Sequence, residues 1–162
     1  MLRHIAAVRF AAVFLALLAV AGCSQKNRPD LATEQQAVPG SERDFIVNVG
    51  DRIYFIVDQS TLTPEAQETL RRQAAWLRQY PSVTIQIEGH SDERGTREYN
   101  IALSARRAAA TRQFLAAQGV EASRLSTIAY GKERPVAVCD AESCYSQNRR
   151  AVTVITGGAV SG

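Results

Sequence analysis

The sequence predicts an α/β sandwich for residues 44–157, on two observations. Runs of residues with the two-residue period of strands alternate along the chain with runs in which apolar residues recur every three or four positions, as in helices. Elements that alternate in this way favour a sheet with helices packed against it. A stretch of this length also suits one domain with a single core.

The domain is expected to begin with two short strands. Residues 45–49 and 52–57 are rich in β-branched and aromatic side chains, which favour extended backbone. The pair Gly50-Asp51 between them is a turn signal. We therefore predict one strand on each side of this turn.

Two helices are predicted. The first covers residues 64–79, because Thr63 is a suitable N-cap and Pro64 takes the first helical position. The second covers residues 97–118, an alanine-rich stretch with larger apolar residues along one side. Gly119 follows it, at the position just beyond a helix C-terminus that glycine favours.

Three more strands complete the expected sheet. Residues 83–88 alternate between apolar and polar side chains, which is the pattern of a strand with one face in solvent. Residues 125–130 and 149–156 are further runs with apolar bulk. The segment 131–146 between the last two is expected to be turn-rich.

The N-terminus predicts export. Within residues 1–22, Arg3 and Arg9 precede an apolar run that ends in small residues, which is the pattern of a secretory signal. The run is too short for a spanning helix, which needs about 20 apolar residues. The stretch VAGC, residues 20–23, resembles the lipobox of bacterial lipoproteins, and this resemblance implies that Cys23 becomes a lipidated N-terminus. The alternative is an ordinary signal peptide with a chance cysteine nearby.

Charge and composition indicate the character of the segments outside the domain, which are residues 1–43 and 158–162. Residues 1–22 hold two of the 19 Lys and Arg residues and none of the 16 acidic ones, so their removal lowers the formal net charge from +3 to +1, 17 basic against 16 acidic. This balance gives no support for nucleic acid binding. Residues 23–43 are polar and contain two prolines, and we expect a flexible tether. Residues 158–162 are expected to form a disordered tail.

Polar side chains concentrate in EGHSDERG, residues 88–95, between a predicted strand and a predicted helix, where sites are often located. A metal site there would use His90 and Asp92 with Glu88 or Glu93. A hydrolase would use Glu88 and Asp92 as a general acid and base pair. No nucleophile elbow or phosphate-binding loop accompanies them. A solvated loop without function is a further alternative.

A binding site accounts for more of these residues. Asn100, Leu103, Ser104 and Arg107 recur at helical spacing, so they can line one side of the helix after the loop. If Asp92 and Arg107 point into one cleft, the carboxylate can accept an ammonium group while the guanidinium holds a carboxylate in a bidentate manner. The sequence thus predicts a receptor for a zwitterionic ligand.

The same residues carry a family resemblance. The stretch EGHSDERGTREYNIALSARRA resembles the signature of the OmpA-like peptidoglycan-binding domain, in which a G-H-[ST]-D loop precedes N-x-x-L-S-x-x-R-A. The segments RIYFIVDQSTL and QNRRAVTV resemble its first and last elements, so the similarity covers about residues 50–156. With the lipobox and the tether, the whole chain resembles the peptidoglycan-associated lipoprotein family of the Tol-Pal envelope system. The resemblance implies an α+β fold, a mixed four-stranded sheet with two main helices on one face.

The resemblance also implies a function and a set of ligand contacts. Family members are non-catalytic modules that bind the diaminopimelate of uncrosslinked peptidoglycan stem peptides, and no cofactor is implied. By match to the motif, the contacts are Asp92 with the diaminopimelate ammonium, Arg107 with its carboxylate, Asn100 and Leu103 along the cleft, and the backbone around Asp58. From its residue type alone, Asp58 suits a turn equally well. Many relatives have Phe where this chain has Val57, which implies a slightly more open cleft here.

The implied partners follow from the same resemblance. They are peptidoglycan, the outer membrane through the lipid on Cys23, and the periplasmic β-propeller protein TolB, which binds relatives on a surface that overlaps the wall-binding cleft. Such a chain faces the periplasm, links membrane to wall, and supports envelope integrity and constriction at cell division. Two rivals are a periplasmic peptidoglycan hydrolase or metalloenzyme that uses Glu88, His90 and Asp92, and the wall-anchoring domain of a flagellar stator, which keeps an uncleaved spanning helix.

Cys139 and Cys144 lie in CDAESC, shortly before the last predicted strand. In an exported protein, two such cysteines more often form a disulfide than a reactive pair, and redox enzymes more typically use C-x-x-C. We predict a disulfide that holds the segment leading into the last strand.

Overall fold

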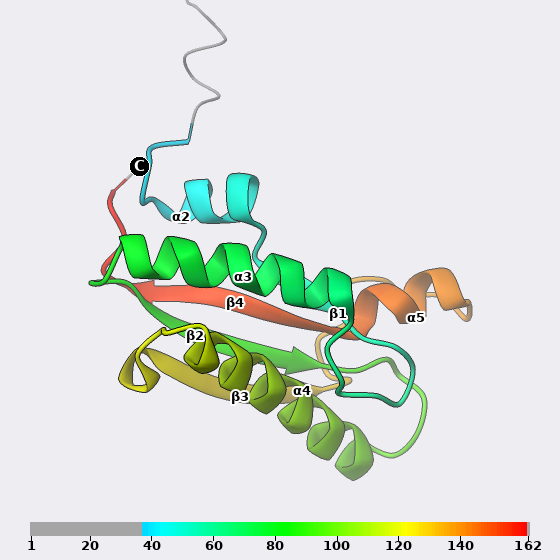
Figure 1. Cartoon of the computed structure of the whole chain (residues 1–162). Helices are drawn as coiled ribbons and strands as arrows, with labels where there is room; N and C mark the ends of the chain where they lie inside the picture. Colours follow the sequence, from blue (N-terminus) through cyan, green and yellow to red (C-terminus); the bar gives the residue numbers. More distant parts are fainter. Residues whose placement is uncertain (1–36, 162) are drawn as a thin grey trace, which may run out of the picture. The chain divides into compact units, whose positions relative to one another are not determined.

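The computed structural model describes residues 37–161, and a compact unit begins at Ala37 (Figure 1). The expected signal peptide, Cys23 and the first part of the tether lie outside the described residues. In chain order, the elements are α2 (Glu42–Asp44), η2 (Phe45–Val49), β1 (Arg52–Tyr54), α3 (Pro64–Gln79), β2 (Thr84–His90), α4 (Arg97–Ala117), η3 (Ala122–Arg124), β3 (Leu125–Gly131), α5 (Glu142–Asn148) and β4 (Arg150–Gly157).

Four strands form one mixed sheet in the order β1-β4-β2-β3. β2 and β3 are parallel, whereas β4 is antiparallel to both of its neighbours, β1 and β2. The helices α3 and α4 lie on the same side of the sheet (Figure 1). The predicted fold class, an α+β domain with a mixed four-stranded sheet and two main helices on one face, is confirmed.

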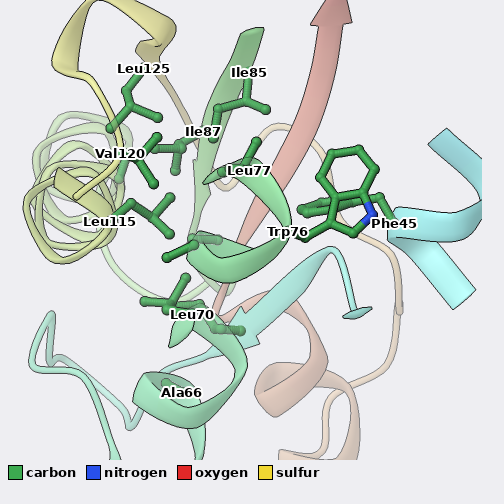
Figure 2. Packing of buried hydrophobic residues seen from close by; sticks show 14 of the residues in the cluster. Phe45, Ala66, Leu70, Trp76, Leu77, Ile85, Ile87, Leu115, Val120 and Leu125 are labelled. Atoms are coloured by element: carbon green, nitrogen blue, oxygen red, sulfur yellow. The ribbon is translucent and has the colours of Figure 1, made fainter. Parts of the chain in front are cut away.

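The core lies between these helices and the sheet (Figure 2). Leu70 and Leu77 of α3, Leu115 of α4, and Ile85 and Ile87 of β2 each expose 1% or less of their surface. Alternate residues of the strand and residues two helical turns apart therefore meet in one interior. Burial of each such side chain contributes about 1.5–3 kcal/mol, which makes this interior the main stabilising feature.

Both main helices match their predictions closely. α3 begins at Pro64, and the hydroxyl of Thr63 accepts a hydrogen bond from the backbone N–H of Ala66 at 3.2 Å. α4 ends one residue earlier than the sequence predicts. Gly119 beyond it has a φ of 90°, a left-handed conformation in which glycine carries no steric cost.

The prediction of a strand over residues 45–49 is wrong. These residues form the π-helical turn η2, which follows the short helix α2. The carboxylate of Asp44 fixes this start, since it accepts hydrogen bonds from the Gly40 N–H at 2.9 Å and the Trp76 indole N–H at 2.8 Å. The ring of Phe45 then packs against that of Trp76, with 4.9 Å between centroids. The β-rich composition favoured a strand, but contacts with α3 decide the local structure.

The ordered domain extends beyond residues 44–157 at both ends. Residues 37–43, expected in the tether, include the first two residues of α2, and Ser41 is buried. Val160, expected in a disordered tail, forms a parallel bridge with Ser41, and its N–H donates to the Gly40 carbonyl at 3.0 Å. A single backbone bridge leaves no periodic pattern in a sequence, so the sequence alone does not reveal it.

The segment before β4 is more regular than predicted. It contains the seven-residue helix α5, whose N-cap residue, Ala141, offers no side-chain hydrogen bond and hence no start signal. The predicted disulfide between Cys139 and Cys144 is present at the beginning of this helix. None of the helices described for residues 37–161 has the length and apolar character required to cross a membrane.

Candidate ligand-binding site

A pocket of about 340 Å³ opens where β2 ends and α4 begins, and the loop after β1 also borders it. The residues predicted to contact ligand, which come from three separate segments, all line this pocket; they are Asp58, Asp92, Asn100, Leu103 and Arg107. The other lining residues are Val57, Arg94, Gly95 and Tyr99. The convergence of Asp92 and Arg107 on one cleft is therefore a feature of the fold, and their ligand contacts stay a prediction.

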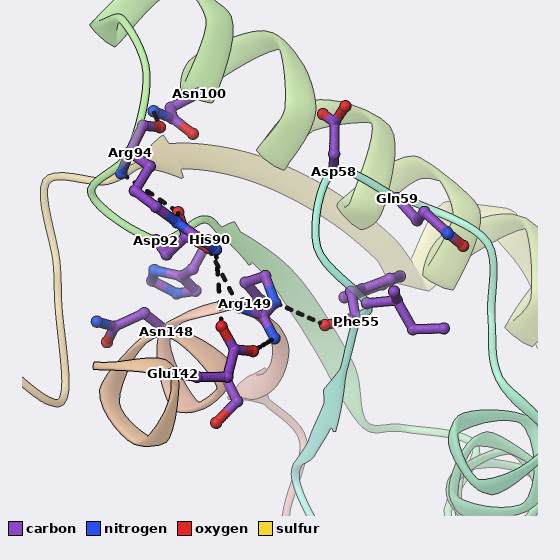
Figure 3. A network of polar contacts seen from close by, with 12 residues as sticks. Phe55, Asp58, Gln59, His90, Asp92, Arg94, Asn100, Glu142, Asn148 and Arg149 are labelled. Carbon is purple, nitrogen blue, oxygen red and sulfur yellow. Dashed lines mark hydrogen bonds and ion pairs between the residues drawn. The ribbon is translucent and has the colours of Figure 1, made fainter. Parts of the chain in front are cut away.

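Two arginines bind the carboxylate of Asp92 (Figure 3). Arg94 donates from Nη2 to Oδ2 at 2.6 Å and from Nε to Oδ1 at 3.1 Å, which is a bidentate pair. Arg149 donates from Nη1 to Oδ2 at 3.3 Å. Burial would raise the pKa of Asp92, but the hydrogen bonds from Arg94 and Arg149 outweigh it and hold the pKa below its ordinary value. Asp92 is thus an anion at neutral pH, which suits cation binding.

Arg149 is a fixed part of this network. Its side chain is only 7% exposed, its Nε donates to the Phe55 carbonyl at 3.0 Å, and its Nη2 pairs with Glu142 of α5 (Figure 3). Through Arg149, the Asp92 carboxylate is connected to the end of β1 and to α5. The disulfide between Cys139 and Cys144 lies at the start of α5, the helix that carries Glu142.

Arg107 reaches the pocket from α4, but its guanidinium is already engaged. The side chain is fully buried, and it donates from Nε to the Gln59 carbonyl at 2.9 Å, from Nη1 to the His90 carbonyl at 2.9 Å and from Nη2 to the Ile56 carbonyl at 3.2 Å. Burial, followed by the charge of Arg149, lowers the pKa of Arg107 to about 10, so it remains cationic at pH 7.

This geometry corrects the expectation of an Arg107 side chain devoted to ligand. Its three hydrogen bonds hold the loop after β1 against the end of β2, so Arg107 also builds the pocket. A guanidinium has five N–H donors, and the two not used here have no acceptor among residues 37–161.

Asp58 borders the pocket in an unusual backbone conformation. Its φ of 58° is the only positive value of a non-glycine residue in the described part of the chain. Aspartate tolerates this region better than most residues do. The Tyr99 hydroxyl of α4 donates a hydrogen bond to the Asp58 carboxylate. Asp58 is therefore a turn residue, as its type suggested, that also faces the candidate site.

Asn100 and Leu103 line the pocket from the first turns of α4. The Asn100 amide donates to the carbonyls of Arg94 at 2.8 Å and Thr96 at 3.0 Å, so it fixes the loop that carries Asp92. Leu103 is nearly fully buried and supplies an apolar wall. The pocket thus combines a fixed loop, an apolar side and opposite charges.

His90 is not among the residues that line the pocket. Its ring is 2% exposed, and neither ring nitrogen has a hydrogen-bond partner among residues 37–161. Burial, followed by the charges of Arg150 and Arg134, lowers the pKa of His90 to about 4. Nε2 lies 3.6 Å from a carboxylate oxygen of Glu88. The described part of the chain brings no three His, Cys, Asp or Glu side chains together in a way that could hold a metal ion.

Acid should destabilise the domain through His90. The unfolded chain takes up a proton near the ordinary pKa of 6.5, whereas the folded protein resists protonation until about 4. The contribution of neutral His90 to the stability of the folded domain is therefore complete above about pH 6.5 and is lost as the pH falls toward 4. When the pH falls from 7.5 to 4.5, the unfolding free energy of both proteins should decrease. We expect the decrease to be about 2 kcal/mol smaller for His90→Gln than for the wild type. Urea melts at both pH values measure this, and equal losses would contradict it.

Comparison with known proteins adds independent evidence about the family of this chain. A sequence profile of the OmpA family matches residues 54–149, a range that contains every residue lining the pocket. The chain belongs to the OmpA family. A peptidoglycan-associated lipoprotein of Agrobacterium fabrum is 63% identical to this OmpA-family chain over 147 residues, which cover 86% of the chain and 83% of the relative. One of Brucella melitensis is 57% identical, with 96% and 98% covered.

Solved structures of the OmpA-family fold are similar as well. The peptidoglycan-associated lipoprotein of Burkholderia pseudomallei has a TM-score of 0.64 and 39% identity, and the match covers 65% of this chain and 90% of that one. The C-terminal domain of Helicobacter pylori MotB has a TM-score of 0.62 at 23% identity, with 66% and 84% covered. The MotB likeness concerns the fold alone.

Sequence reasoning missed the residues that pair with Asp92. Arg149 lies in the segment QNRRAVTV, whose apolar residues and resemblance predict a last strand but no partner for the arginine. Arg94 lies within EGHSDERG, but nothing in that stretch indicates which acid it pairs with. Glu142 and Tyr145, which lie beside these arginines, belong to the helix that was not predicted. An arginine at the start of a predicted buried strand was the one available signal, because such a charge needs a partner.

Proposed function

We propose that this OmpA-family chain is a non-catalytic lipoprotein that binds peptidoglycan through the diaminopimelate of its stem peptides. The observation that carries the proposal is that Asp92 and Arg107, of opposite charge, line one pocket. The names of the relatives, peptidoglycan-associated lipoproteins, support the same class of ligand. Diaminopimelate ends in a carbon that carries both an ammonium and a carboxylate group, and the pocket offers one counter-charge for each.

In the proposed complex, the ligand ammonium binds the Asp92 carboxylate, and the ligand carboxylate lies against Arg107 and backbone N–H groups near Asp58. Leu103 and Val57 contact the methylene chain between the two ends of the amino acid. Hydrogen bonds to charged groups contribute about 1.5–3 kcal/mol each where water is partly excluded. The low exposure of Asp92 and Arg107 places both charges in that regime.

The proposal extends to the envelope. After removal of residues 1–22, Cys23 carries lipid in the outer membrane, the tether spans the gap, and the domain holds the wall from the periplasmic side. The chain then acts within the Tol-Pal system, where TolB and peptidoglycan compete for overlapping surfaces, and it supports envelope integrity and constriction at division. These steps rest on the lipobox and on the resemblance to the peptidoglycan-associated lipoproteins.

Features of the site favour binding over hydrolysis. The pKa of Asp92 is held below its ordinary value, so this carboxyl group is a poor proton donor near neutral pH. The pKa of His90 is about 4 and its ring lies outside the pocket, so it neither carries a proton at pH 7 nor reaches a ligand there. The alternative of an enzyme built on Glu88, His90 and Asp92 therefore has less physical support.

Replacement of Asp92 tests the proposed function. Asp92→Asn keeps the shape of the side chain but removes the charge that binds the ligand ammonium, so we expect at least a tenfold loss of retention on purified sacculi. Asp140→Asn, at an exposed position that does not line the pocket, is the matched control and should bind normally. Thermal melts confirm that each variant is folded. Wild-type retention by folded Asp92→Asn would refute the assignment, and release of soluble muropeptides by the wild type would favour a hydrolase.

A further inference from the structure

Of the two arginines that bind Asp92, Arg94 has the more exposed side chain. Its side chain is 44% exposed, in contrast to 7% for Arg149, the other arginine on the same carboxylate. Both Nε and Nη2 of Arg94 point at Asp92, at the position where the proposed function places the ligand cation (Figure 3). In this structure, the guanidinium of Arg94 thus occupies the carboxylate that the proposed ligand ammonium would bind.

The backbone of Arg94 is fixed, whereas its side chain borders solvent, with 44% of its surface exposed. Its carbonyl accepts from the buried Asn100 amide at 2.8 Å, and its own N–H donates to Asp92 Oδ1 at 3.2 Å. If the guanidinium leaves, Asp92 keeps this N–H and the hydrogen bond from Arg149. Departure of the side chain therefore opens the carboxylate to the pocket and leaves the loop in place.

A second group of interaction partners for the Arg94 guanidinium lies next to Asp92. Arg94 Nη2 is 3.9 Å from a carboxylate oxygen of Glu142, and Arg94 Cζ is 4.4 Å from the centre of the Tyr145 ring. Both residues belong to α5, and Glu142 is well exposed. A carboxylate and an aromatic face together accept a displaced arginine without loss of its charge partners.

We propose that Arg94 is a latch: it occupies Asp92 in the free protein, and a cationic group of the ligand exchanges with it while the guanidinium moves onto Glu142 and Tyr145. This inference rests on the proposed function of the same pocket. The exchange costs little, because the ligand ammonium replaces the guanidinium as the cation on Asp92, and the guanidinium keeps Glu142 and Tyr145 as partners. It makes binding selective for ligands whose cation can replace the guanidinium at Asp92.

The test compares Arg94→Gln with wild type, each as the full chain in detergent, by calorimetric titration with a soluble stem peptide that ends in diaminopimelate. We expect Arg94→Gln to bind about threefold to fivefold more tightly, since the ligand no longer competes with an internal cation. The matched control is Arg97→Gln, which removes the same charge from an exposed arginine that pairs with Glu133, and it should leave affinity within twofold. A peptide whose terminal amine is acetylated should show no gain on Arg94→Gln.

A spectroscopic readout follows the latch itself. The Nε–H resonance of Arg94, assigned by its absence in Arg94→Gln, should shift and exchange faster with water when the wild type is saturated with peptide. Unchanged or weaker binding by Arg94→Gln, or an Nε–H signal that ligand does not move, overturns the latch while the binding function stands. If neither protein binds the peptide, the proposed function fails and the latch fails with it.

Discussion

Arg107→Ala is expected to destabilise the domain around the pocket and also to abolish ligand binding. The guanidinium donates to three backbone carbonyls, of Ile56, Gln59 and His90, which belong to two segments far apart in sequence. Its removal takes a charged donor from each of these carbonyls, of which the Ile56 carbonyl also accepts from the Gln59 N–H at 3.2 Å, and it leaves a large cavity at a side-chain position that is fully buried. We expect a loss of about 3–5 kcal/mol of unfolding free energy together with the loss of peptidoglycan binding.

The measurement is a urea melt of Arg107→Ala beside its neighbour Arg106→Ala. Arg106 is exposed on the same helix, so its replacement removes an equal charge and should change stability by less than about 0.5 kcal/mol. A normal melt of Arg107→Ala with binding abolished would show that the residue serves ligand alone, and the structural role assigned to it here would be wrong. A direct contact with ligand is better tested at Asp92, whose removal leaves these carbonyl contacts intact.

Gly89→Ala is expected to destabilise the domain strongly, because the added methyl group has no room between β2 and α4. Gly89 lies in β2 on the face that meets α4, and an added Cβ would lie 2.0 Å from the Ser104 carbonyl oxygen and 3.2 Å from Cβ of Ala108. The helix would have to move away from the sheet, which also displaces Arg107 one turn along. We expect the unfolding free energy to fall by about 3 kcal/mol or more, which is at or above the upper end of the usual cost of overpacking a core.

Gly157→Ala provides the control for a glycine in a strand. A Cβ at this position in β4 would meet only the Thr84 hydroxyl, at 3.3 Å, which a small side-chain movement relieves. Thermal melts of the two variants should therefore differ widely, and the Gly89 variant should also lose sacculus binding. If Gly89→Ala melts like the wild type, α4 does not rest on β2 as closely as described.

Local signals explain which elements the sequence predicts. The helix α3 is recovered because its start is encoded by adjacent residues, an N-cap threonine and a proline. The turn η2 is not recovered, because Asp44 and Phe45 are fixed by Trp76, which is about thirty positions away. The helix α5 is too short for a period and lacks a cap. Elements defined by distant partners leave no pattern in a single window of sequence.

The site divides in the same way. The helical spacing after the loop shows which residues can line one side of α4, and the resemblance to the OmpA-like signature implies that Asp92 and Arg107 serve one cleft. The sequence did not predict that Arg107 also holds three carbonyls, or that Arg149, from the other end of the domain sequence, reaches Asp92. Charge pairing of this kind depends on how the sheet orders its strands, with β4 inserted between β1 and β2.

The bridge between Ser41 and Val160 bears on how the domain would carry force. That bridge lies near the start of β2, where Ser82 also bonds to the Gly158 carbonyl, whereas Asp92 follows its end. A pull applied at Ala37 against a ligand held in the pocket would run along the strands, over a length of roughly 20 Å. The force would then act in shear on the hydrogen-bond ladder between β2 and β4. All hydrogen bonds of the ladder would bear the force together, and they would not break one after another.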